Sequence, residues 1–356
     1  MRDWTIENLT PKNIWAVAEL QESHYGKVDD TSHAAYLEYL YFQNPAGPVL
    51  GYLAWNAAKR EAVGGYSLTC VPLKIGTHVE SCVLSGNSLT RASHRGQGVY
   101  STLINQAYRH AAENGRLMVY GMPNQNSYPV HLRQGLFQDL GAVPLYLRPL
   151  RPSGMVRSYL KSNVLAALAR PFNGLFYPRN SPELSFVKLT NDNLNLADQF
   201  WDSIKDKYPI MVARDSSRLA WRFLNIPRRK YECWYAMANG APVAFVIGRE
   251  MEVAGIRCAM LADLLFLKGH ELEAKSLIRK VLNLLREQGA DMAGCMMLSH
   301  CAEQLLLRQL GFFRCPKFME PQPFPLCIHQ FREPLESVDV ADLKNWFFTM
   351  GDYDVV

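Results

Sequence analysis

Two short sequence patterns each occur twice along the chain, and their spacing constrains the fold more than any other feature. Helix-like "YLEYLYFQNP" (36–45) and "RLAWRFLNIP" (218–227) both stop at a proline, and a strand-like segment follows each. "LRQGLF" (132–137) and "LRQLGFF" (307–313) form a second pair, so the offsets are 182 and roughly 176 residues. Nearly equal offsets indicate a tandem duplication, and 356 residues is long for one core. The predicted division is a first domain at 1–150, a linker at 151–182, a second domain at 183–333, and a helix or tail at 334–356.

Each half has the same predicted order of elements: strand, one or two helices, several strands, helix, strand, helix and closing strands. In the first half, residues 99–114 carry apolar side chains at helical spacing and end at Asn114-Gly115. The apolar strand "RLMVYGMP" follows, and then a helix from about Asn126 to Arg133. This order predicts an α/β chain in which a mixed sheet is flanked by helices.

The stretch "SGNSLTRASHRGQGVYSTLINQAYRHAAENG" (85–115) runs from a strand through two glycines into a helix. Backbone N–H groups at such a helix start point into one concavity, and the helix dipole adds positive charge. Glycine lets a ligand approach the backbone closely, while Arg95, Ser101 and Thr102 add donors. A pyrophosphate fits such a site. The loop lacks both the GK[ST] ending and the GxGxxG spacing, and a glycine pair before a helix is by itself more often a simple turn and cap.

The order strand, "RGQG", helix, apolar strand, "PNQNS" and "GLF" resembles the GCN5-related N-acetyltransferase (GNAT) superfamily. Arg95 and Gly98 match the family pattern Arg/Gln-x-x-Gly-x-Gly/Ala, whereas Tyr100 stands where that pattern has Gly or Ala. The resemblance implies a tandem duplicated GNAT fold with acetyl-CoA or another acyl-CoA as co-substrate. It implies that the loop backbone binds the pyrophosphate and that pantetheine lies between parting strands. The implied cofactor-binding residues are Leu89, Thr90, Arg91, Arg95, Gly96, Gln97, Gly98, Val99, Tyr100, Ser101, Asn124 and Ser127.

The second half lacks this loop. Its corresponding stretch is "FLKGHELEAKSLIRKVL" (266–282), in which Glu271 and Glu273 occupy the place of anion donors. Two carboxylates beside a pyrophosphate would repel it strongly in a desolvated site. The prediction is that the second domain does not bind coenzyme A.

The resemblance also implies a reaction, in which an unprotonated amine attacks the acyl-CoA thioester directly. A backbone N–H near Leu89 to Arg91 would then bind the oxyanion. In the family a Tyr four residues before the "GF" glycine often meets the leaving thiolate; here His131 has that position, and Tyr128 lies one helical turn away. His131 and Tyr128 are the predicted catalytic residues. The alternatives are a surface histidine on an amphipathic helix and a packing tyrosine.

The general base stays open at this level. Candidates in the first half are Glu80, His78, Asn87 (which can only orient another group) and Tyr66. Asp263, in "MLADLLF", is a lone carboxylate in an apolar strand, where burial would raise its pKa; a structural Asp is the alternative. The eight cysteines form no CxxC pair and no HExxH occurs, so we expect buried thiols in a reducing compartment and no metal.

The linker combines basic and apolar residues. No acidic residue lies between Asp139 and Glu183, whereas six basic residues do, and they account for the excess over neutrality in a chain of net charge +5. The segment 155–177 mixes these with Leu, Val, Phe and Tyr, which would suit an anionic membrane surface, a phosphate-bearing substrate or a strap with solvated charges. The sequence has neither a signal-peptide pattern nor an apolar run of membrane-spanning length, which predicts a cytoplasmic protein, with peripheral contact to the inner membrane as a hypothesis.

The acceptor is the least constrained part of the prediction. The layout resembles tandem GNAT proteins of bacterial exopolysaccharide and cell-envelope glycan synthesis, which implies an amino sugar, nucleotide-linked or lipid-linked, and no nucleic acid partner. One alternative is an aminoacyl-tRNA-dependent peptidyl transferase of the Fem kind, and another is a non-catalytic acyl-CoA-binding protein. The aromatic and acidic tail "NWFFTMGDYDVV" (345–356) could close over a cleft.

Overall fold

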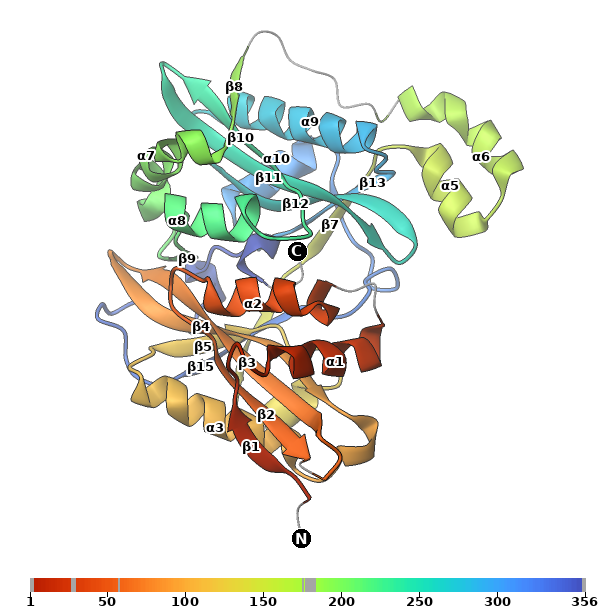
Figure 1. The fold of residues 1–356 in the computed structure, drawn as a ribbon. Coiled ribbons are helices and arrows are strands. Elements are labelled where there is room, and N and C mark those ends of the chain that lie inside the picture. Colours follow the sequence, from red (N-terminus) through yellow and green to blue (C-terminus); the bar gives the residue numbers. More distant parts are fainter. Residues whose placement is uncertain (1–2, 27–29, 57, 175, 177–183, 354–356) are drawn as a thin grey trace. The chain divides into compact units, whose positions relative to one another are not determined.

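The computed structural model describes residues 3–26, 30–56, 58–174, 176 and 184–353, and these form two compact units (Figure 1). Unit 1 comprises Met1–Leu140, Asn225–Arg229 and Leu326–Ala341; unit 2 comprises Gly141–Leu224, Lys230–Pro325 and Asp342–Val356. Each unit therefore takes segments from both halves of the sequence. The domain boundaries proposed from the sequence stay a prediction about how the duplication arose.

Unit 1 is built around a mixed sheet with the strand order β1-β2-β3-β4-β5-β15-β6. Its strands are β1 (Thr5–Asn8), β2 (Leu50–Asn56), β3 (Glu61–Ile75), β4 (His78–Thr90), β5 (Met118–Gly121), β6 (Gln138–Ala142) and β15 (Pro325–Gln330). Its α-helices in the described residues are α1 (Ile14–Tyr25), α2 (Ala34–Phe42), α3 (Val99–Glu113) and α4 (Tyr128–Arg133). The helices predicted near 99–114 and 126–133 are thus α3 and α4.

Helix α3 lies close against β3 because the strand carries a glycine there. A Cβ on Gly64 would come within 2.5 Å of a Val99 methyl group, so no other residue fits without a shift. The buried side of α3 contributes Val99, Leu103, Ile104, Ala107 and Ala111 to the core of the unit. This packing fixes the start of α3 over the ends of the central strands.

Strands β4 and β5 part from each other where β4 continues. They pair in parallel only at Val83–Val119 and Leu84–Tyr120, yet β4 runs on to Thr90 while β5 ends at Gly121. The pairing of β4 with β3 is also irregular, with a register shift between Gly65 and Ser67. The last residues of β4 therefore have no β5 partner. The sequence-based expectation of parting strands has its counterpart here.

Unit 2 repeats the same strand order, as β8-β10-β11-β12-β13-β7-β14. The strands of this sheet are β7 (Leu145–Pro149), β8 (Ser185–Lys188), β10 (Glu232–Ala238), β11 (Ala241–Val253), β12 (Ile256–Phe266), β13 (Met292–Met296) and β14 (Phe313–Arg314). The short strand β9 (Ile210–Val212) is not part of this sheet. The α-helices of unit 2 in the described residues are α5 (Pro152–Leu160), α6 (Asn163–Ala169), α7 (Asn195–Ile204), α8 (Ser216–Leu219), α9 (Glu271–Glu287) and α10 (Ala302–Gln309). A π-helical turn, Ala220–Leu224, extends α8. Shared strand order is what a duplication predicts.

The two sheets exchange one strand. β15, from the end of the second half, lies between β5 and β6, and β7, from the first half, takes the equivalent place between β13 and β14. We had expected each half to supply its own closing strands. Only Val143 and Pro144 separate β6 from β7, and a residue before proline favours extended backbone over a tight hairpin turn. The chain therefore leaves one sheet and enters the other.

The C-terminal tail belongs to the core of unit 2. Its described part contains two 3₁₀ turns, Leu343–Asn345 and Met350–Asp352, and the side chains of Trp346, Phe347 and Phe348 are buried. The suggestion that the tail closes over a cleft is thus wrong for residues 345–353, and residues 354–356 lie outside the described part. All eight cysteines are free and buried. None of the helices in the described residues is long and apolar enough to cross a bilayer.

Candidate functional site

The glycine loop before α3 has the backbone that an anion site needs. Gly96 and Gly98 have φ of 75° and 77°, in the left-handed region that favours glycine. A Cβ at either position would meet nothing within 4 Å, so backbone conformation and not space requires these glycines. The first intrahelical bond runs from Thr102 N–H to Gly98 O, 3.0 Å apart. The amides of residues 99–101 precede it and can donate to an anion.

Two cavities lie beside this loop in unit 1. The first, which we call the strand cavity, has a volume of about 370 Å³ and is lined by His24, Tyr25, Ser88, Leu89, Thr90, Arg95, Tyr100, Asn124, Asn126, Ser127 and Val130. The second, the loop cavity, has a volume of about 320 Å³ and is lined by Thr90, His94, Gly96, Gly98, Val99, Tyr100, Ser101, Val130, Arg133 and Gln134. Thr90, Tyr100 and Val130 line both. An extended ligand that runs from the loop to the parting strands would therefore pass Thr90, Tyr100 and Val130.

Ten of the twelve residues predicted to bind the cofactor line one of these cavities. The other two turn away. Arg91 donates from Nε to Ala62 O at 2.7 Å and pairs with Glu61, and Gln97 donates to Ser93 O at 3.1 Å. Their predicted role in cofactor binding has no support from this geometry, whereas the other ten stay candidates.

Asn124 organises the turn between β5 and α4. Its Oδ1 accepts from the backbone N–H groups of Asn126 and Ser127, both at 3.0 Å. The amide nitrogen of Asn124 is the donor that the turn does not use, and Asn124 lines the strand cavity. This arrangement holds a hydrogen-bond donor at the gap between β4 and β5.

His131 lies behind Tyr100 and lines neither cavity. Its side chain is 2% exposed, its ring stacks on Phe137 at 4.3 Å, and its Nε2 is 2.8 Å from the Tyr100 hydroxyl. Burial lowers the pKa of His131 to about 4, so the ring is neutral near pH 7. The surface-histidine alternative is thereby wrong, and His131 reaches a ligand only through Tyr100.

Tyr128 is directed away from the parting strands. Its hydroxyl donates to Asp139 Oδ2 at 2.5 Å, and that bond, with a contribution from burial, raises the pKa of Tyr128 to about 12. Tyr128 lines neither cavity. Its predicted catalytic role therefore depends on a rearrangement of α4.

Tyr100 lines both cavities and also contacts His131. Its hydroxyl meets His131, and hydrogen bonds from Ser88 and Ser127 favour its ionised form. Burial nevertheless dominates and raises the pKa of Tyr100 to about 12, so the hydroxyl keeps its proton. The sequence signal was present, because a tyrosine stood where the family pattern has a small residue, but it was interpreted only as a departure.

Several lining residues had no place in the sequence prediction: His24, Tyr25, Ser88, His94, Asn126, Val130, Arg133 and Gln134. Ser88 directly precedes the predicted oxyanion segment and could have been included on that ground. His24 and Tyr25 end α1, far from the loop in sequence, and only the fold brings them to the strand cavity.

The base candidates of the first half have other partners. His78 and Glu80 begin β4, about 26 Å or more along the strand from Ser88 at ~3.3 Å per residue. Burial acts to raise the pKa of Glu80, but bonds from Arg332 (2.8 Å) and Leu335 N–H (3.0 Å) outweigh it and lower that pKa. His78 Nδ1 lies 2.6 Å from Glu336. A general base from this pair is therefore unsupported.

Asn87 and Tyr66 are also engaged. Asn87 donates to the Tyr41 hydroxyl at 2.7 Å, and the Tyr66 hydroxyl lies 2.8 Å from Ser85 Oγ. Burial raises the pKa of Tyr66, so it is not a base near neutral pH. Neither residue lines the two cavities.

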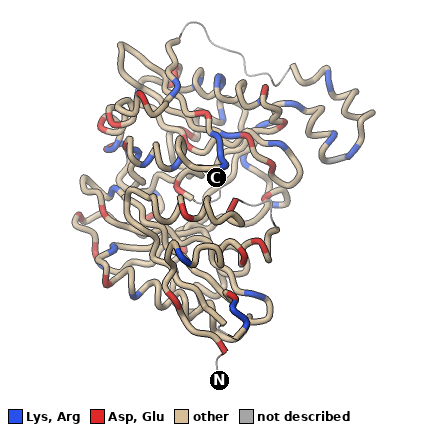
Figure 2. Tube along the Cα trace, viewed as in Figure 1, with Lys and Arg blue, Asp and Glu red and all other residues tan. Residues whose placement is uncertain are grey.

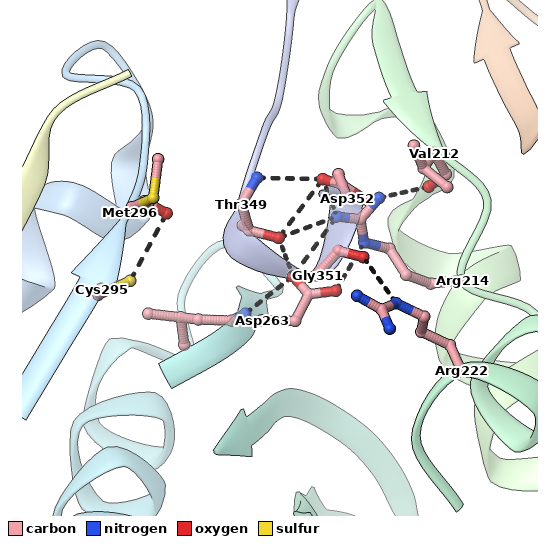
Figure 3. A network of polar contacts seen from close by, with 10 residues as sticks. Val212, Arg214, Arg222, Asp263, Cys295, Met296, Thr349, Gly351 and Asp352 are labelled. Atoms are coloured by element: carbon pink, nitrogen blue, oxygen red, sulfur yellow. Dashed lines mark hydrogen bonds and ion pairs between the residues drawn. The ribbon is translucent and has the colours of Figure 1, made fainter. Parts of the chain in front are cut away.

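Asp263 lies in a buried polar cluster within unit 2 (Figure 3). Its carboxylate accepts from Arg214 Nε at 3.1 Å and from Thr349 Oγ1 at 3.1 Å, and Arg214 also reaches Asp352 at 2.7 Å. Burial raises the pKa of Asp263, and Arg214 acts in the opposite direction. The cluster ties the tail to β12. The structural interpretation of Asp263 thus fits its contacts better than a role as base.

The position in unit 2 that corresponds to the glycine loop is filled by the chain itself. Glu271 Oε1 accepts from Gly269 N–H at 3.2 Å at the start of α9. Hydrogen bonds from the backbone of Glu271 itself and from that of Gly269 lower the pKa of the Glu271 carboxyl. Glu273 pairs with His270 at 3.4 Å. A carboxylate already takes the helix-start donors that an incoming phosphate would need. The prediction that unit 2 does not bind coenzyme A stays a prediction, and this contact supports it.

The buried His131 has a measurable consequence for stability. The unfolded chain binds a proton at the ordinary histidine pKa of 6.5, whereas the folded chain does so only at about 4. The stabilisation is complete above pH 6.5 and is lost as pH falls towards 4, to a total of about 3 kcal/mol. Urea unfolding at pH 7 and pH 4.5 should show that His131→Gln loses less stability on acidification than the wild type. His24→Gln, at an exposed histidine, is the control; an identical pH dependence in His131→Gln would contradict the prediction.

Comparison with known proteins identifies the fold. No family model matches the chain, and no curated protein matches it. Among solved structures, Saccharomyces cerevisiae N-myristoyltransferase with bound myristoyl-CoA matches at a TM-score of 0.65 and 9% identity, over 92% of this chain and 83% of that one. A GCN5-related N-acetyltransferase from Anabaena variabilis matches at 0.61 and 11%, over 92% and 73%. A probable N-acyltransferase from Enterococcus faecalis matches at 0.64 and 10%, over 93% and 73%. The chain has the fold of the GNAT acyl-CoA N-acyltransferases, in a duplicated form.

Proposed function

We propose that this protein is an acyl-CoA-dependent N-acyltransferase whose acyl-CoA site lies in unit 1. The observation that carries the proposal is the pair of left-handed glycines at the start of α3, beside cavities that extend to the point where β4 and β5 part. A helix start with free amides binds phosphate, and a gap between strands accepts an extended chain. The fold of the solved N-acyltransferases agrees with this proposal.

In this proposal the pyrophosphate binds in the loop cavity, on the amides of residues 99–101. Arg133 lines that cavity and Arg95 lines the neighbouring one, so each can pair with phosphate oxygens. Pantetheine then passes Tyr100 into the strand cavity, where Asn124 and Ser127 meet its amides. The thioester comes to rest beside Leu89 and Thr90, whose backbone N–H groups are the candidates for the oxyanion.

In the proposed reaction, Tyr100 donates a proton to the sulfur of the leaving group. The acceptor nitrogen forms a bond to the acyl carbon, the C–S bond breaks, and sulfur takes the Tyr100 proton; the proton of the new ammonium restores the tyrosine through water. His131 Nδ1 has no hydrogen-bond partner among the described residues. An unpaired acceptor is more common in protein interiors than an unpaired N–H, so we assign the proton to Nε2. His131 then donates to Tyr100 and leaves its hydroxyl proton for the ligand.

For the acceptor we propose an amino sugar. None of the lining residues of the strand cavity is Asp or Glu, so nothing in this lining attracts a polycation such as a polyamine. The lining instead combines the ring pair of His24 and Tyr25, 4.6 Å apart, with the amides of Asn124 and Asn126. Rings and amides suit a sugar with many hydroxyl groups, and Arg95 suits a phosphate carried on it. A lipid-linked form of this acceptor would require the protein to work at a membrane surface.

Gly98→Glu tests the proposed cofactor site. A glutamate at φ of 77° is strained, and its carboxylate would face the pyrophosphate, so affinity for acyl-CoA should fall by about 100-fold or more. Titration calorimetry of the wild type should give one coenzyme A per chain. Gly115→Glu, at φ of 67° beyond the other end of α3, carries the same strain and should bind normally.

Four outcomes would contradict the proposal. A folded Gly98→Glu variant with unchanged affinity would move the site elsewhere. Two molecules per chain would show that unit 2 also binds coenzyme A. A wild type that binds no acyl-CoA would favour a Fem-type transferase, and one that binds acyl-CoA without transfer to amines or amino sugars would favour a non-catalytic binding protein.

A further inference from the structure

The segment between β7 and β8 folds into a small helical hairpin in unit 2, formed by α5, α6 and a 3₁₀ turn at Arg170–Gly174 (Figure 1). Two hydrogen bonds hold its ends together: Asn173 Nδ2 donates to Ser153 Oγ at 2.8 Å, and Ser153 N–H donates to Asn173 Oδ1 at 3.1 Å. Arg151, at the start of the hairpin, anchors it to the rest of unit 2 by donating from Nε to Asp291 Oδ1 at 2.8 Å. The hairpin is therefore a fixed part of unit 2 and not a loose linker.

The second helix of this hairpin presents large apolar side chains to solvent. Val164 is 73% exposed and Leu168 is 67% exposed, and Leu165 and Phe172 are exposed as well. At 100° per residue, Val164, Leu165 and Leu168 fall within one face of the helix. Large apolar side chains that gather on one helix face indicate a surface that something covers.

The charges of the hairpin all have one sign (Figure 2). Figure 2 shows Lys and Arg but no Asp or Glu along the hairpin, as the sequence requires, since no acidic residue lies between Asp139 and Glu183. Arg157, Lys161 and Arg170 are exposed. Within the described part of the chain none of these three lies within ion-pair distance of a carboxylate, unlike Arg151. Burial raises the pKa of Asp291, and Arg157 acts with Arg151 in the opposite direction from a greater distance. Lys161 precedes α6 and Arg170 follows it, so cations flank the apolar face at both ends.

We propose that this hairpin binds the surface of an anionic lipid bilayer. The apolar face of α6 enters the boundary between headgroups and acyl chains, and Arg157, Lys161 and Arg170 contact the acidic headgroups. Charge complementarity favours a bilayer over a second copy of this chain, since two identical cationic hairpins would repel each other. The inference does not depend on acyl transfer, and the two proposals can fail separately.

Co-sedimentation of the full chain with vesicles tests the proposal. The wild type should partition roughly tenfold or more better into phosphatidylcholine vesicles with 30% phosphatidylglycerol than into pure phosphatidylcholine. The double variant Val164→Gln/Leu168→Gln should lower partitioning by roughly tenfold or more. The triple variant Arg157→Gln/Lys161→Gln/Arg170→Gln should remove the dependence on phosphatidylglycerol.

The control is Leu272→Gln/Leu305→Gln, which removes two exposed leucines from other helices of unit 2. It should bind vesicles like the wild type, and far-ultraviolet circular dichroism should be the same for all variants. No binding by the wild type, or equal binding by the double variant, would overturn the proposal. So would a wild-type dimer in light scattering that the double variant converts to a monomer, since a second copy would then cover the face.

Discussion

Replacing Tyr100 by phenylalanine is expected to lower kcat for acyl transfer by about 10²–10³-fold and to change KM little. Tyr100 lines both cavities, and its hydroxyl lies 2.8 Å from His131 Nε2 and keeps its proton because burial raises the pKa of Tyr100 to about 12. A donor that meets the departing sulfur stabilises the transition state more than the bound substrate. The phenylalanine ring keeps the packing of the tyrosine ring, so the loss of kcat measures the contribution of the hydroxyl group alone.

Three further variants separate catalysis from packing. Tyr66→Phe, whose hydroxyl bonds Ser85 outside both cavities, is the matched control and should keep kcat close to the wild type. Tyr128→Phe should also have little effect. His131→Gln can still donate to the tyrosine hydroxyl, so it should retain more activity than His131→Leu. If Tyr100→Phe turns over like the wild type across pH 6–9, Tyr100 only packs, and the leaving thiolate takes its proton from elsewhere.

Replacing Arg214 by methionine is expected to cost about 3–5 kcal/mol of unfolding free energy. Arg214 is 2% exposed and holds Asp263 at 3.1 Å and Asp352 at 2.7 Å, and both carboxylates are equally buried. Without the guanidinium, the two buried carboxylates lose the cation that bonds both of them (Figure 3). The penalty comes mainly from the desolvation of these two charges, which the guanidinium no longer offsets.

Chemical denaturation at pH 7 measures this effect. Arg257→Met, at a half-exposed ion pair with Glu250, is the control and should cost less than about 1 kcal/mol. Adding Asp263→Asn and Asp352→Asn to Arg214→Met should recover part of the loss, because neither of these two buried side chains then carries a charge. A loss no larger than that of the Arg257 control would show that the cluster is not a buried, charge-dependent tie between the tail and β12.

The sequence was informative where function depends on neighbouring residues in the chain. The loop from Arg95 to Ser101, the helix it starts and the competing carboxylate of Glu271 are each contained within one short window. Local backbone chemistry, namely glycine at positive φ and free helix-start amides, therefore allowed their prediction. The echoes between 36–45 and 218–227 also predicted that the second half repeats the elements of the first, but not the order of the strands in each sheet or the exchange of β7 and β15.

Long-range contacts were not predictable in this way. The bond between Tyr100 and His131 joins two helices 31 positions apart, and no spacing rule links a residue in α3 to one in α4. The same holds for Arg332, which donates a hydrogen bond to Glu80 although the two residues lie 252 positions apart in the sequence. Asp263 looked like a base because its sequence neighbours are apolar, whereas its cation comes from position 214. Pairing of buried charges is decided by the fold, and sequence patterns report only burial.

The exchanged strands also determine when the protein can fold. A ribosome releases β1 to β6 early, yet the place between β5 and β6 stays empty until β15, at Pro325–Gln330, has been synthesised. Until then two strand edges are exposed to pairing with other nascent chains. A fragment that ends at residue 150 would lack β15 and keep a surplus β7. An independently folding unit 1 would have to combine residues 1–140 with 225–229 and 326–341, so no single cut in the chain separates the two folding units.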